Sequence, residues 1–327
     1  MSRTEALDFW PGRRVLVTGA NGFVGGWLTK ALIERGAAVV AFVRDQVLGG
    51  LDLHRCLTHS RVFGDLSDGP LVGRVLNEYE VDTVFHLAAQ ALVPVAARKP
   101  QATFESNVRG TWTLLEQCRL TRGVERIVVS TSDKVYGSQS GAVDENAPLL
   151  GRFPYDASKV CADVIAQSYA LSFGLPLVVM RCANIYGGGD LNFSRIVPYA
   201  VRNALRGEPI ILRSNGTLRR ELIYVEDAVT AFLEVAEALN RADIGAQAFN
   251  FGSGESIDVN SLVTRIIEVV GRDPVEVVHA PEGSGGEIPE QSLNTAKAQR
   301  LLDWRPCTSL TSGLHQTVDW YRSHLRL

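Results

Sequence analysis

The sequence predicts an α/β protein with a parallel sheet that is covered by helices on both faces. Apolar runs such as "RRVLVTG", "AAVVAFVRD" and "VDTVFHLAA" have the length of buried strands. Segments with helical spacing, such as "ANGFVGGWLTKALIERG" and "DGPLVGRVLNEYE", lie between these runs, and the connections are short. Strands that alternate with helices in this way form parallel sheets, because each crossover helix packs back onto a face of the sheet.

The alternation continues through more than half of the chain. "NVRGTWTLLEQCRLTRG" leads into "VERIVVSTS", and "YDASKVCADVIAQSYALSFG" leads into "LPLVVMRCANIYG". We therefore assign residues 1–187 to one domain, with a returning segment near 220–250 that contains a predicted helix, "LIYVEDAVTAFLEVAEAL". Residues 188–327 are less regular and predict a smaller α/β carboxy-terminal lobe, with helices at "RIVPYAVRNALRG" and "SLVTRIIEVVG" and short strands at "PIILRS" and "AFNFGS".

The amino-acid composition of the chain argues against some classes of function. The chain has 327 residues, 46% of them hydrophobic and 21% charged, and a formal net charge of -3. These values are typical of a globular protein, and they argue against nucleic-acid binding, which normally needs a basic face. No run of about twenty apolar residues predicts a membrane span. The segment "MSRTEALDFWPGRR" lacks the apolar core of a signal peptide, so we expect a cytoplasmic protein without a membrane partner.

The cysteines and histidines do not predict a metal site. The five cysteines are odd in number, widely spread and without metal-binding spacing, so we expect reduced core residues, which are listed here: Cys56, Cys118, Cys161, Cys182 and Cys307. His86 ends an apolar run and has no second ligand near it in the sequence, so we expect a hydrogen-bonded core histidine. We expect no catalytic metal.

A glycine-rich turn predicts a dinucleotide site. Gly19, Gly22 and Gly25 in "TGANGFVGG" follow a predicted strand and open a predicted helix. Glycines there permit a tight turn and a close approach of the backbone to a pyrophosphate, and the helix start offers N–H donors to the anion. This context is typical of a Rossmann-type doubly wound sheet. We expect Asn21, Phe23 and Val24 of the same turn to bind the cofactor as well. The alternative is an ordinary tight turn.

The identity of the dinucleotide depends on the end of the second predicted strand. Arg44 would bind a 2′-phosphate and favour NADP, whereas Asp45 would accept hydrogen bonds from a free ribose and favour NAD. We expect NAD and keep NADP as the alternative. Asp65 follows the third predicted strand, where its carboxylate would accept a hydrogen bond from the adenine amino group; the alternative is a turn aspartate.

Tyr155 and Lys159 in "PYDASK" are the candidate acid–base pair. Their spacing of four puts both side chains on one face of a predicted helix. A cation beside a phenol favours the phenolate and would lower the pKa of Tyr155 from about 10 toward neutrality. Tyr155 would then take a proton from a sugar or alcohol hydroxyl, near the hydroxyl-rich strand end at Ser130, Thr131 and Ser132. The alternative is a solvated helix face.

The order of these motifs resembles a known family. "VTGANGFVGGWL", "FGDL", "HLAAQ", "STSDKVYG", "PYDASK", "RCANIYGGGD" and "YVED" are similar, over nearly the whole chain, to motifs of the extended short-chain dehydrogenases/reductases, specifically the nucleotide-sugar epimerases and dehydratases. Within that group, "FWPGRRVLVTGANGFVGGWL", "TSDKVYG" and "IYGGGD" resemble the CDP-glucose 4,6-dehydratases most.

The resemblance implies roles for individual residues. Tyr155 takes the proton of the sugar 4-hydroxyl while the C4 hydride passes to the nicotinamide, Ser132 bonds the reacting oxygen, and Lys159 holds both the tyrosine and the cofactor ribose. Further cofactor contacts are expected from Leu66, Leu87, Ala88 and Ala89. Substrate contacts are expected from Gln90, Asn184, Asn192, Arg195 and Arg220, with Arg219 as a competitor of Arg220.

Asp133 and Lys134 separate a dehydratase from an epimerase. A dehydratase must remove the C5 proton and expel the 6-hydroxyl, so Asp133 would protonate that hydroxyl, and Lys134 would serve as the C5 base or position a water. Lys134 acts as a base only if its pKa falls from about 10.4 toward neutrality. Many related dehydratases have glutamate there, whereas the CDP-glucose group has lysine. The alternative is a plain ion pair in an epimerase or reductase.

We therefore expect a nucleotide-sugar 4,6-dehydratase of the CDP-glucose type that recycles its NAD internally and takes a nucleotide-diphosphate sugar. A 4-epimerase of the same family and a non-enzymatic dinucleotide-binding module are the alternatives. The resemblance also implies a homodimer formed by the helices of "NVRGTWTLLEQC" and "VCADVIAQSYALSF". Glu287 and Gln291, at the glycine-rich segment "PEGSGGEIPE", are candidates for a lid over the site.

Overall fold

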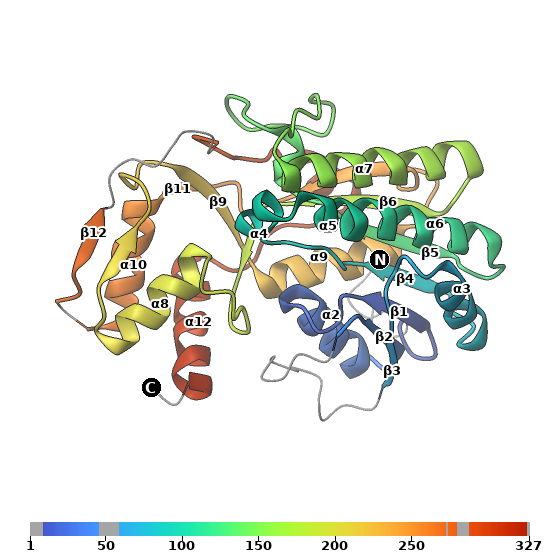
Figure 1. Cartoon of the computed structure of the whole chain (residues 1–327), viewed down its shortest axis with the longest axis horizontal. Helices are drawn as coiled ribbons and strands as arrows, with labels where there is room; N and C mark the ends of the chain where they lie inside the picture. The colour runs from blue at the N-terminus through green and yellow to red at the C-terminus, as the bar shows by residue number, and fades with distance from the viewer. Residues whose placement is uncertain (1–8, 46–58, 273, 280–287, 326–327) are drawn as a thin grey trace.

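A seven-stranded parallel sheet forms the centre of the molecule (Figure 1). The computed structural model describes residues 9–45, 59–272, 274–279 and 288–325. The strand order is β10-β6-β5-β4-β1-β2-β3, and every neighbouring pair is parallel, which confirms the predicted fold class. The strands are β1 (Arg14–Thr18), β2 (Ala38–Val43), β3 (Ser60–Phe63), β4 (Thr83–His86), β5 (Arg126–Ser130), β6 (Leu177–Cys182) and β10 (Gln247–Phe251).

Helices cover both faces of this sheet. One face carries α2 (Phe23–Glu34), α9 (Val225–Ala238) and the short α11 (Ala296–Leu302). The other carries α3 (Gly69–Glu78), α6 (Gly110–Leu120) and α7 (Pro154–Phe173), with α4 (Val93–Arg98), α5 (Pro100–Phe104) and the π-helical turn η1 (Glu105–Arg109) beside α7. Because side chains alternate along a strand, Val15 and Val17 enter the first core and Leu16 enters the second.

The helix α7 has clear start and stop signals. It begins with Pro154, whose missing N–H costs nothing in a first turn. It ends at Gly174, which adopts φ +66°, a conformation that glycine tolerates well. Its first turn lies at the carboxyl end of β5, so the sequence places Tyr155 at that edge of the sheet.

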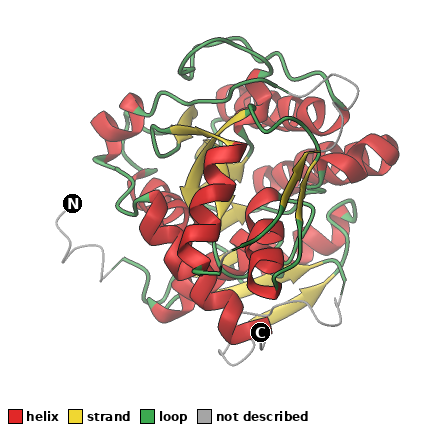
Figure 2. Cartoon of the chain, turned by 90° about the vertical axis from the view of Figure 1, so that its left-hand side faces the viewer, coloured by secondary structure: helices red, strands yellow, loops and turns green. Residues whose placement is uncertain are grey.

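A smaller lobe extends from this sheet on the left of Figure 1, and this side of the molecule faces the viewer in Figure 2. Its three-stranded sheet has the order β11-β9-β7, and β8 pairs with β12 in a second small sheet. Three helices pack around the lobe's own core. The bounds are β7 (Asn184–Tyr186), β8 (Ile210–Leu212), β9 (Arg219–Tyr224), β11 (Ser256–Asp258), β12 (Val277–His279), α8 (Ile196–Arg206), α10 (Val259–Val270) and α12 (Leu310–Leu325). The predicted domain division at residue 187 stays a prediction.

Three expectations need correction. The strand predicted at "AFNFGS" for the smaller lobe is β10, which belongs to the central sheet and pairs with β6. The segment predicted as one helix from Leu222 divides, because β9 continues to Tyr224 and α9 begins at Val225, where Glu226 and Asp227 favour a helix start. Cys161 and Cys307 are exposed rather than core residues, whereas Cys118 and Cys182 are buried; these four are free thiols, and Cys56 lies outside the described residues. None of the helices in the described ranges has the length and apolar content needed to cross a bilayer.

Candidate active site

A cleft of about 1090 Å³ runs along the carboxyl edge of the central sheet. The strand order reverses between β1 and β4, so the chain leaves these two neighbouring strands in opposite directions and opens a crevice between their loops. All the predicted site residues line the cleft except Asn21 and Asp45. Those lining it are Gly19, Gly22, Phe23, Val24, Gly25, Arg44, Asp65, Leu66, Leu87, Ala88, Ala89, Gln90, Ser132, Asp133, Lys134, Tyr155, Lys159, Asn184, Asn192, Arg195 and Arg220.

The glycine turn fits a pyrophosphate. Gly19 has φ +74°, and a Cβ atom there would lie 2.8 Å from the backbone nitrogen of Ala88. A Cβ on Gly25 would lie 2.1 Å from the carbonyl oxygen of Gly19. The helix α2 starts after Gly22 without a side-chain cap, which leaves its first N–H groups available to an anion. Close backbone packing and an uncapped helix start are the features a dinucleotide needs.

Arg44 and Asp65 are the charged residues at the adenosine end. Asp45 accepts a hydrogen bond from Arg44 Nε at 2.7 Å and does not line the cleft. Asp65 accepts one from the backbone N–H of Ser67 at 2.8 Å, and this bond holds the pKa of Asp65 below its usual value. Asp65 is therefore both a turn residue and a cleft residue.

Tyr155 and Lys159 enter the cleft from the first two turns of α7, but their electrostatics differ from the expectation. Burial, followed by the charge of Asp133, raises the pKa of Tyr155 to about 12, while Arg195 and hydrogen bonding with Ser132 oppose the increase. Burial lowers the pKa of Lys159 to about 8, and its ammonium donates to the carbonyl oxygen of Ser130 at 2.9 Å. The expected decrease in the Tyr155 pKa is thus wrong for this structure, because desolvation and the charge of Asp133 outweigh the opposing charge of Arg195.

Asp133 and Lys134 lie in the 3₁₀ turn η2 (Asp133–Tyr136), directly after Ser132. The Lys134 ammonium donates to three acceptors: Asp133 Oδ1 at 3.3 Å, Asn184 Oδ1 at 3.2 Å and Gln291 Oε1 at 3.0 Å. All three of its protons are engaged, so in this arrangement Lys134 is a donor and not a base. Asp133 Oδ1 also accepts from Ser132 at 2.8 Å, whereas Oδ2 is buried without a partner.

The arginine on the substrate side is Arg220. It lines the cleft and donates to the carbonyl oxygen of Ile288 at 2.7 Å. Arg219 is not among the lining residues; it bonds to Ser256 and forms an ion pair with Glu290 at 3.6 Å. Alternate side chains of a strand face opposite sides, which explains why these neighbours separate.

Other predicted substrate residues are held by local hydrogen bonds. Arg195, which precedes α8, donates to Asp190 Oδ2 at 2.9 Å. Asn192 Nδ2 is buried without a partner. The carbonyl oxygen of Gln90 accepts from Asn107 Nδ2 at 3.1 Å, which fixes the loop after β4. Gln291 lines the cleft through its contact with Lys134, and Glu287 lies outside the described residues.

Asp156 is a cleft residue that the sequence analysis missed. It lies in the first turn of α7 next to Tyr155, and its side chain is buried. Burial raises its pKa to about 6, with Lys134 opposing the increase and Asp133 adding to it. Its position within "PYDASK" was the one available signal.

His86 is a core residue, as expected. Its two ring nitrogens lie 2.9 Å from the hydroxyls of Thr18 and Thr111, and burial lowers its pKa to about 3. No group of three potential metal ligands occurs among the described histidines, cysteines, aspartates and glutamates.

Comparison with known proteins identifies the family. The model of the NAD dependent epimerase/dehydratase family matches residues 15–252. The chain belongs to this family. CDP-glucose 4,6-dehydratase of Salmonella typhimurium is 30% identical over 98% of this chain and 93% of the relative.

Two solved structures of similar proteins have closely similar folds. UDP-glucose 4-epimerase of Thermotoga maritima, in complex with UDP-glucose, superposes with a TM-score of 0.87 at 29% identity, covering 95% of this chain and 99% of that one. dTDP-glucose 4,6-dehydratase of Bacillus anthracis, in complex with NAD, superposes with a TM-score of 0.85 at 26% identity, covering 96% and 98%. The predictions of the family, an enzyme and an NAD cofactor are confirmed.

We expect Gly25→Ala to weaken NAD binding by at least about tenfold, because the added methyl group would push the Gly19 carbonyl out of the turn. Isothermal titration with NAD measures the change. Gly245→Ala is the control, since its Cβ would have no neighbour nearer than 4.0 Å. Equal NAD affinity in the Gly25→Ala variant and the unmodified chain would contradict this account of the turn.

We expect the stability of the chain relative to an Asp156→Asn variant to fall as the pH rises. The pKa of Asp156 is about 6 in the folded chain, above its ordinary value of 3.8, so folding favours its protonated form. The stabilisation is complete below pH 3.8 and is lost as the pH rises through about 6. Melting temperatures of both proteins at about pH 5 and about pH 8 measure this, and a constant difference between them would refute the expectation.

Proposed function

We propose that this protein is a nucleotide-sugar 4,6-dehydratase of the CDP-glucose type that uses NAD without net consumption. The observation that carries the proposal is that Asp133 and Lys134 follow Ser132 directly and line one cleft with Tyr155. An epimerase needs no such acid beside the ketone, whereas a dehydratase does. The similarity to the Salmonella CDP-glucose 4,6-dehydratase supports the same conclusion.

The residues around Tyr155 suit oxidation of the sugar at C4. Tyr155 accepts the proton of the 4-hydroxyl, and Ser132 bonds the same oxygen. Tyr155 must already be a tyrosinate to accept that proton, and the ammonium of Lys159, buried beside the Ser130 carbonyl, stabilises this anion against the effect of burial. NAD, held by the glycine turn between β1 and α2, would supply a hydride acceptor beside C4 without net consumption.

The turn η2 suits the elimination. Asp133, whose Oδ2 is buried without a hydrogen-bond partner, passes a proton to the departing 6-hydroxyl and regains one when the C5 proton has left. Lys134 orients Asp133 and, when a water replaces Gln291 as its third acceptor, positions the water that carries the C5 proton back to Asp133; its three bonds to acceptors support this role over that of a base. Asn184, Asn192, Arg195 and Arg220 bind the nucleotide-diphosphate part, where guanidinium groups match phosphate oxygens.

A 4-epimerase is the second candidate, because the Thermotoga UDP-glucose 4-epimerase has the same fold at 29% identity. It would use Tyr155, Lys159 and Ser132 in the same way and leave Asp133 and Lys134 as a plain ion pair. Membership of an enzyme family removes the binding-module alternative.

Incubation with CDP-, dTDP-, GDP- and UDP-hexoses, followed by mass spectrometry, separates the two candidates. A dehydratase product is lighter than its substrate by one water, and we expect the largest yield with CDP-glucose. Tyr155→Phe should lower kcat by about 10²- to 10⁴-fold, and Asp133→Asn should slow water loss by about 10²-fold. Tyr169→Phe, also on α7 but bonded to Glu116 and not a cleft residue, is the matched control.

An unchanged mass with inverted C4 stereochemistry would replace the dehydratase by the epimerase. Full activity of Tyr155→Phe would overturn both.

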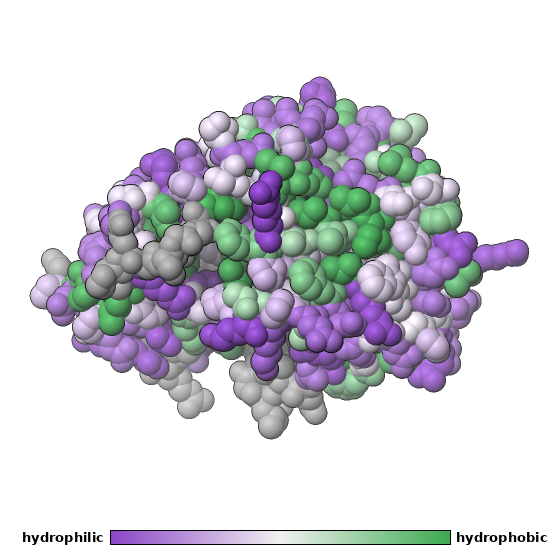
Figure 3. Space-filling model, turned by 45° about the horizontal axis from the view of Figure 1, so that its top comes forward, coloured by the Kyte–Doolittle hydropathy of each residue, from purple (hydrophilic) through white to green (hydrophobic). Residues whose placement is uncertain are grey.

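We also propose that two copies of the chain pair through α6 and α7. Large apolar side chains on these helices are exposed: Trp112 (44%), Val164 (52%), Leu171 (74%) and Phe173 (56%). Figure 3 shows hydrophobic residues gathered on the face that carries the two helices. A patch of this kind usually marks an interface. A cytoplasmic location is part of the proposal, because the four described thiols are free.

Leu171→Glu combined with Val164→Glu should convert the proposed dimer to a monomer, since two copies would bury four unpaired carboxylates. Light scattering after size-exclusion chromatography measures the mass. Phe63→Glu, at an exposed apolar residue of β3, is the control and should stay dimeric. A monomeric mass for the unmodified chain would contradict the pairing.

A further inference from the structure

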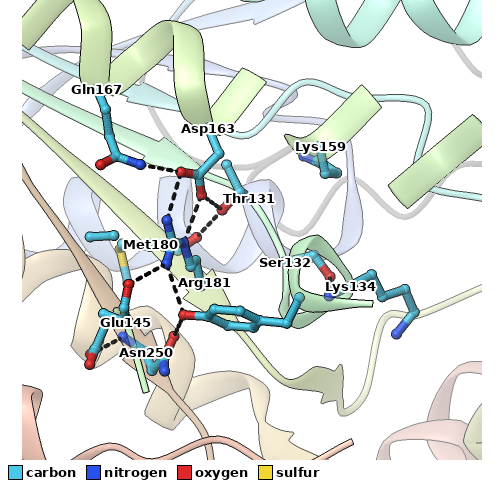
Figure 4. Close-up of polar contacts among 12 residues, drawn as sticks. Thr131, Ser132, Lys134, Glu145, Lys159, Asp163, Gln167, Met180, Arg181 and Asn250 are labelled. Atoms are coloured by element: carbon cyan, nitrogen blue, oxygen red, sulfur yellow. Dashed lines mark hydrogen bonds and ion pairs between the residues drawn. The ribbon is translucent and has the colours of Figure 1, made fainter. Parts of the chain in front are cut away.

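A buried ion pair lies behind the cleft, between α7 and β6 (Figure 4). Asp163 of α7 and Arg181 of β6 are joined by two hydrogen bonds, Nε to Oδ2 and Nη2 to Oδ1, both 2.8 Å long. Their side chains are 0% and 3% exposed. A two-point pair of this kind fixes orientation as well as distance, because the guanidinium plane must match the carboxylate plane.

One end of the pair reaches the strand that precedes Ser132. The Thr131 hydroxyl donates to Asp163 Oδ2 at 3.1 Å, and Thr131 also bonds to the carbonyl oxygen of Met180 at 3.2 Å. Asp163 lies two turns after Tyr155 on the same helix. The helix that carries Tyr155 and Lys159 is therefore tied to the start of the turn η2.

The other end reaches the last residue of η2. Arg181 Nη1 donates to the Tyr136 hydroxyl at 2.9 Å, and its guanidinium carbon lies 5.1 Å from the centre of the Tyr136 ring. The Tyr136 hydroxyl in turn donates to Asn250 Oδ1 of β10 at 2.7 Å. Both ends of η2, which holds Asp133 and Lys134, are thus attached to one buried network.

The network also reaches the segment that carries Gln291. Asn250 Nδ2 donates to the carbonyl oxygen of Asn294 at 3.3 Å, and the backbone N–H of Asn294 donates to the carbonyl oxygen of Val143. Gln291, three residues before Asn294, accepts a hydrogen bond from Lys134. The third acceptor of the Lys134 ammonium is therefore held in place by the same set of contacts.

We propose that Tyr136 is a positioning residue that holds Asp133 and Lys134 in register with Tyr155 and Lys159, through Arg181, Asp163 and Asn250. Tyr136 is buried and touches neither the cleft nor the reacting atoms. Tyr136 acts through η2. Its loss therefore disturbs Asp133 and Lys134, which the elimination needs, more than Tyr155 and Lys159, which the oxidation needs. This inference rests on the proposed dehydratase function and names which step of it depends on the network.

Tyr136→Phe tests the proposal, because it removes only the hydroxyl that joins Arg181 to Asn250. Quenched-flow mass spectrometry separates three species: the substrate, the C4-oxidised sugar that still has its 6-hydroxyl, and the dehydrated product. We expect C4 oxidation to stay within about threefold of the unmodified rate and dehydration to slow by about 10- to 100-fold, so that the oxidised sugar accumulates.

Hydrogen exchange supplies a readout that needs no substrate. We expect faster amide exchange in residues 133–136 of Tyr136→Phe and unchanged exchange in residues 155–163. Thr131→Val, which removes the contact at the other end of η2, should give the same pattern in both assays. Tyr169→Phe is the matched control and should match the unmodified chain.

Two outcomes would overturn the proposal. One is unchanged dehydration in both variants. The other is an equal slowing of oxidation and dehydration, together with a lower melting temperature and faster amide exchange throughout the chain. That second result would indicate a role in stability alone. If the unmodified chain releases no water from any nucleotide hexose, the proposed function fails, and the exchange experiment still decides whether Tyr136 holds η2.

Discussion

The close packing of the Gly19–Gly25 turn against the loop after β4 is the constraint on which the cleft depends. β1 and β4 are neighbours in the sheet, so the loops that leave them have little space, and only backbone without a Cβ fits between them. That packing brings the uncapped start of α2 to the floor of the cleft. It also fixes where β5 ends, and with it the Ser132 to Lys134 segment, because β5 pairs with β4.

The cleft combines several ionisable groups whose burial opposes their charged forms. Burial raises the pKa values of Tyr155 and Asp156 and lowers that of Lys159. Glu221, on β9 near the cleft, follows the same rule with a pKa raised to about 7, although it accepts hydrogen bonds from the backbone N–H groups of Gly254 and Leu293. Desolvation is therefore the largest influence on the proton affinity of these four groups, whereas hydrogen bonding with Ser67 dominates at Asp65.

The sequence predicted the features that local pattern determines. The glycine turn, the parallel sheet and the spacing of Tyr155 and Lys159 all follow from periodicity and short-range sterics. Features that depend on distant contacts could not be predicted. The contact between Lys134 and Gln291 joins residues 157 apart in the chain, the pairing of Arg44 with Asp45 depends on rotamers, and the desolvation of Asp156 depends on how α7 packs. The network around Tyr136 involves six separate segments, and no local signal marks it.

The route of the chain between the central sheet and the β11-β9-β7 sheet limits how such a protein can change. It leaves the large sheet after β6 for β7, returns from β9 through α9 to β10, and departs again for β11. The chain also passes from the lobe to α11 on the large sheet and back to α12, so a recombination event that exchanged the smaller lobe as a unit would need matched breakpoints at all five passages. Changes within the lobe therefore arise more readily through point substitutions or loop insertions, which leave these passages intact.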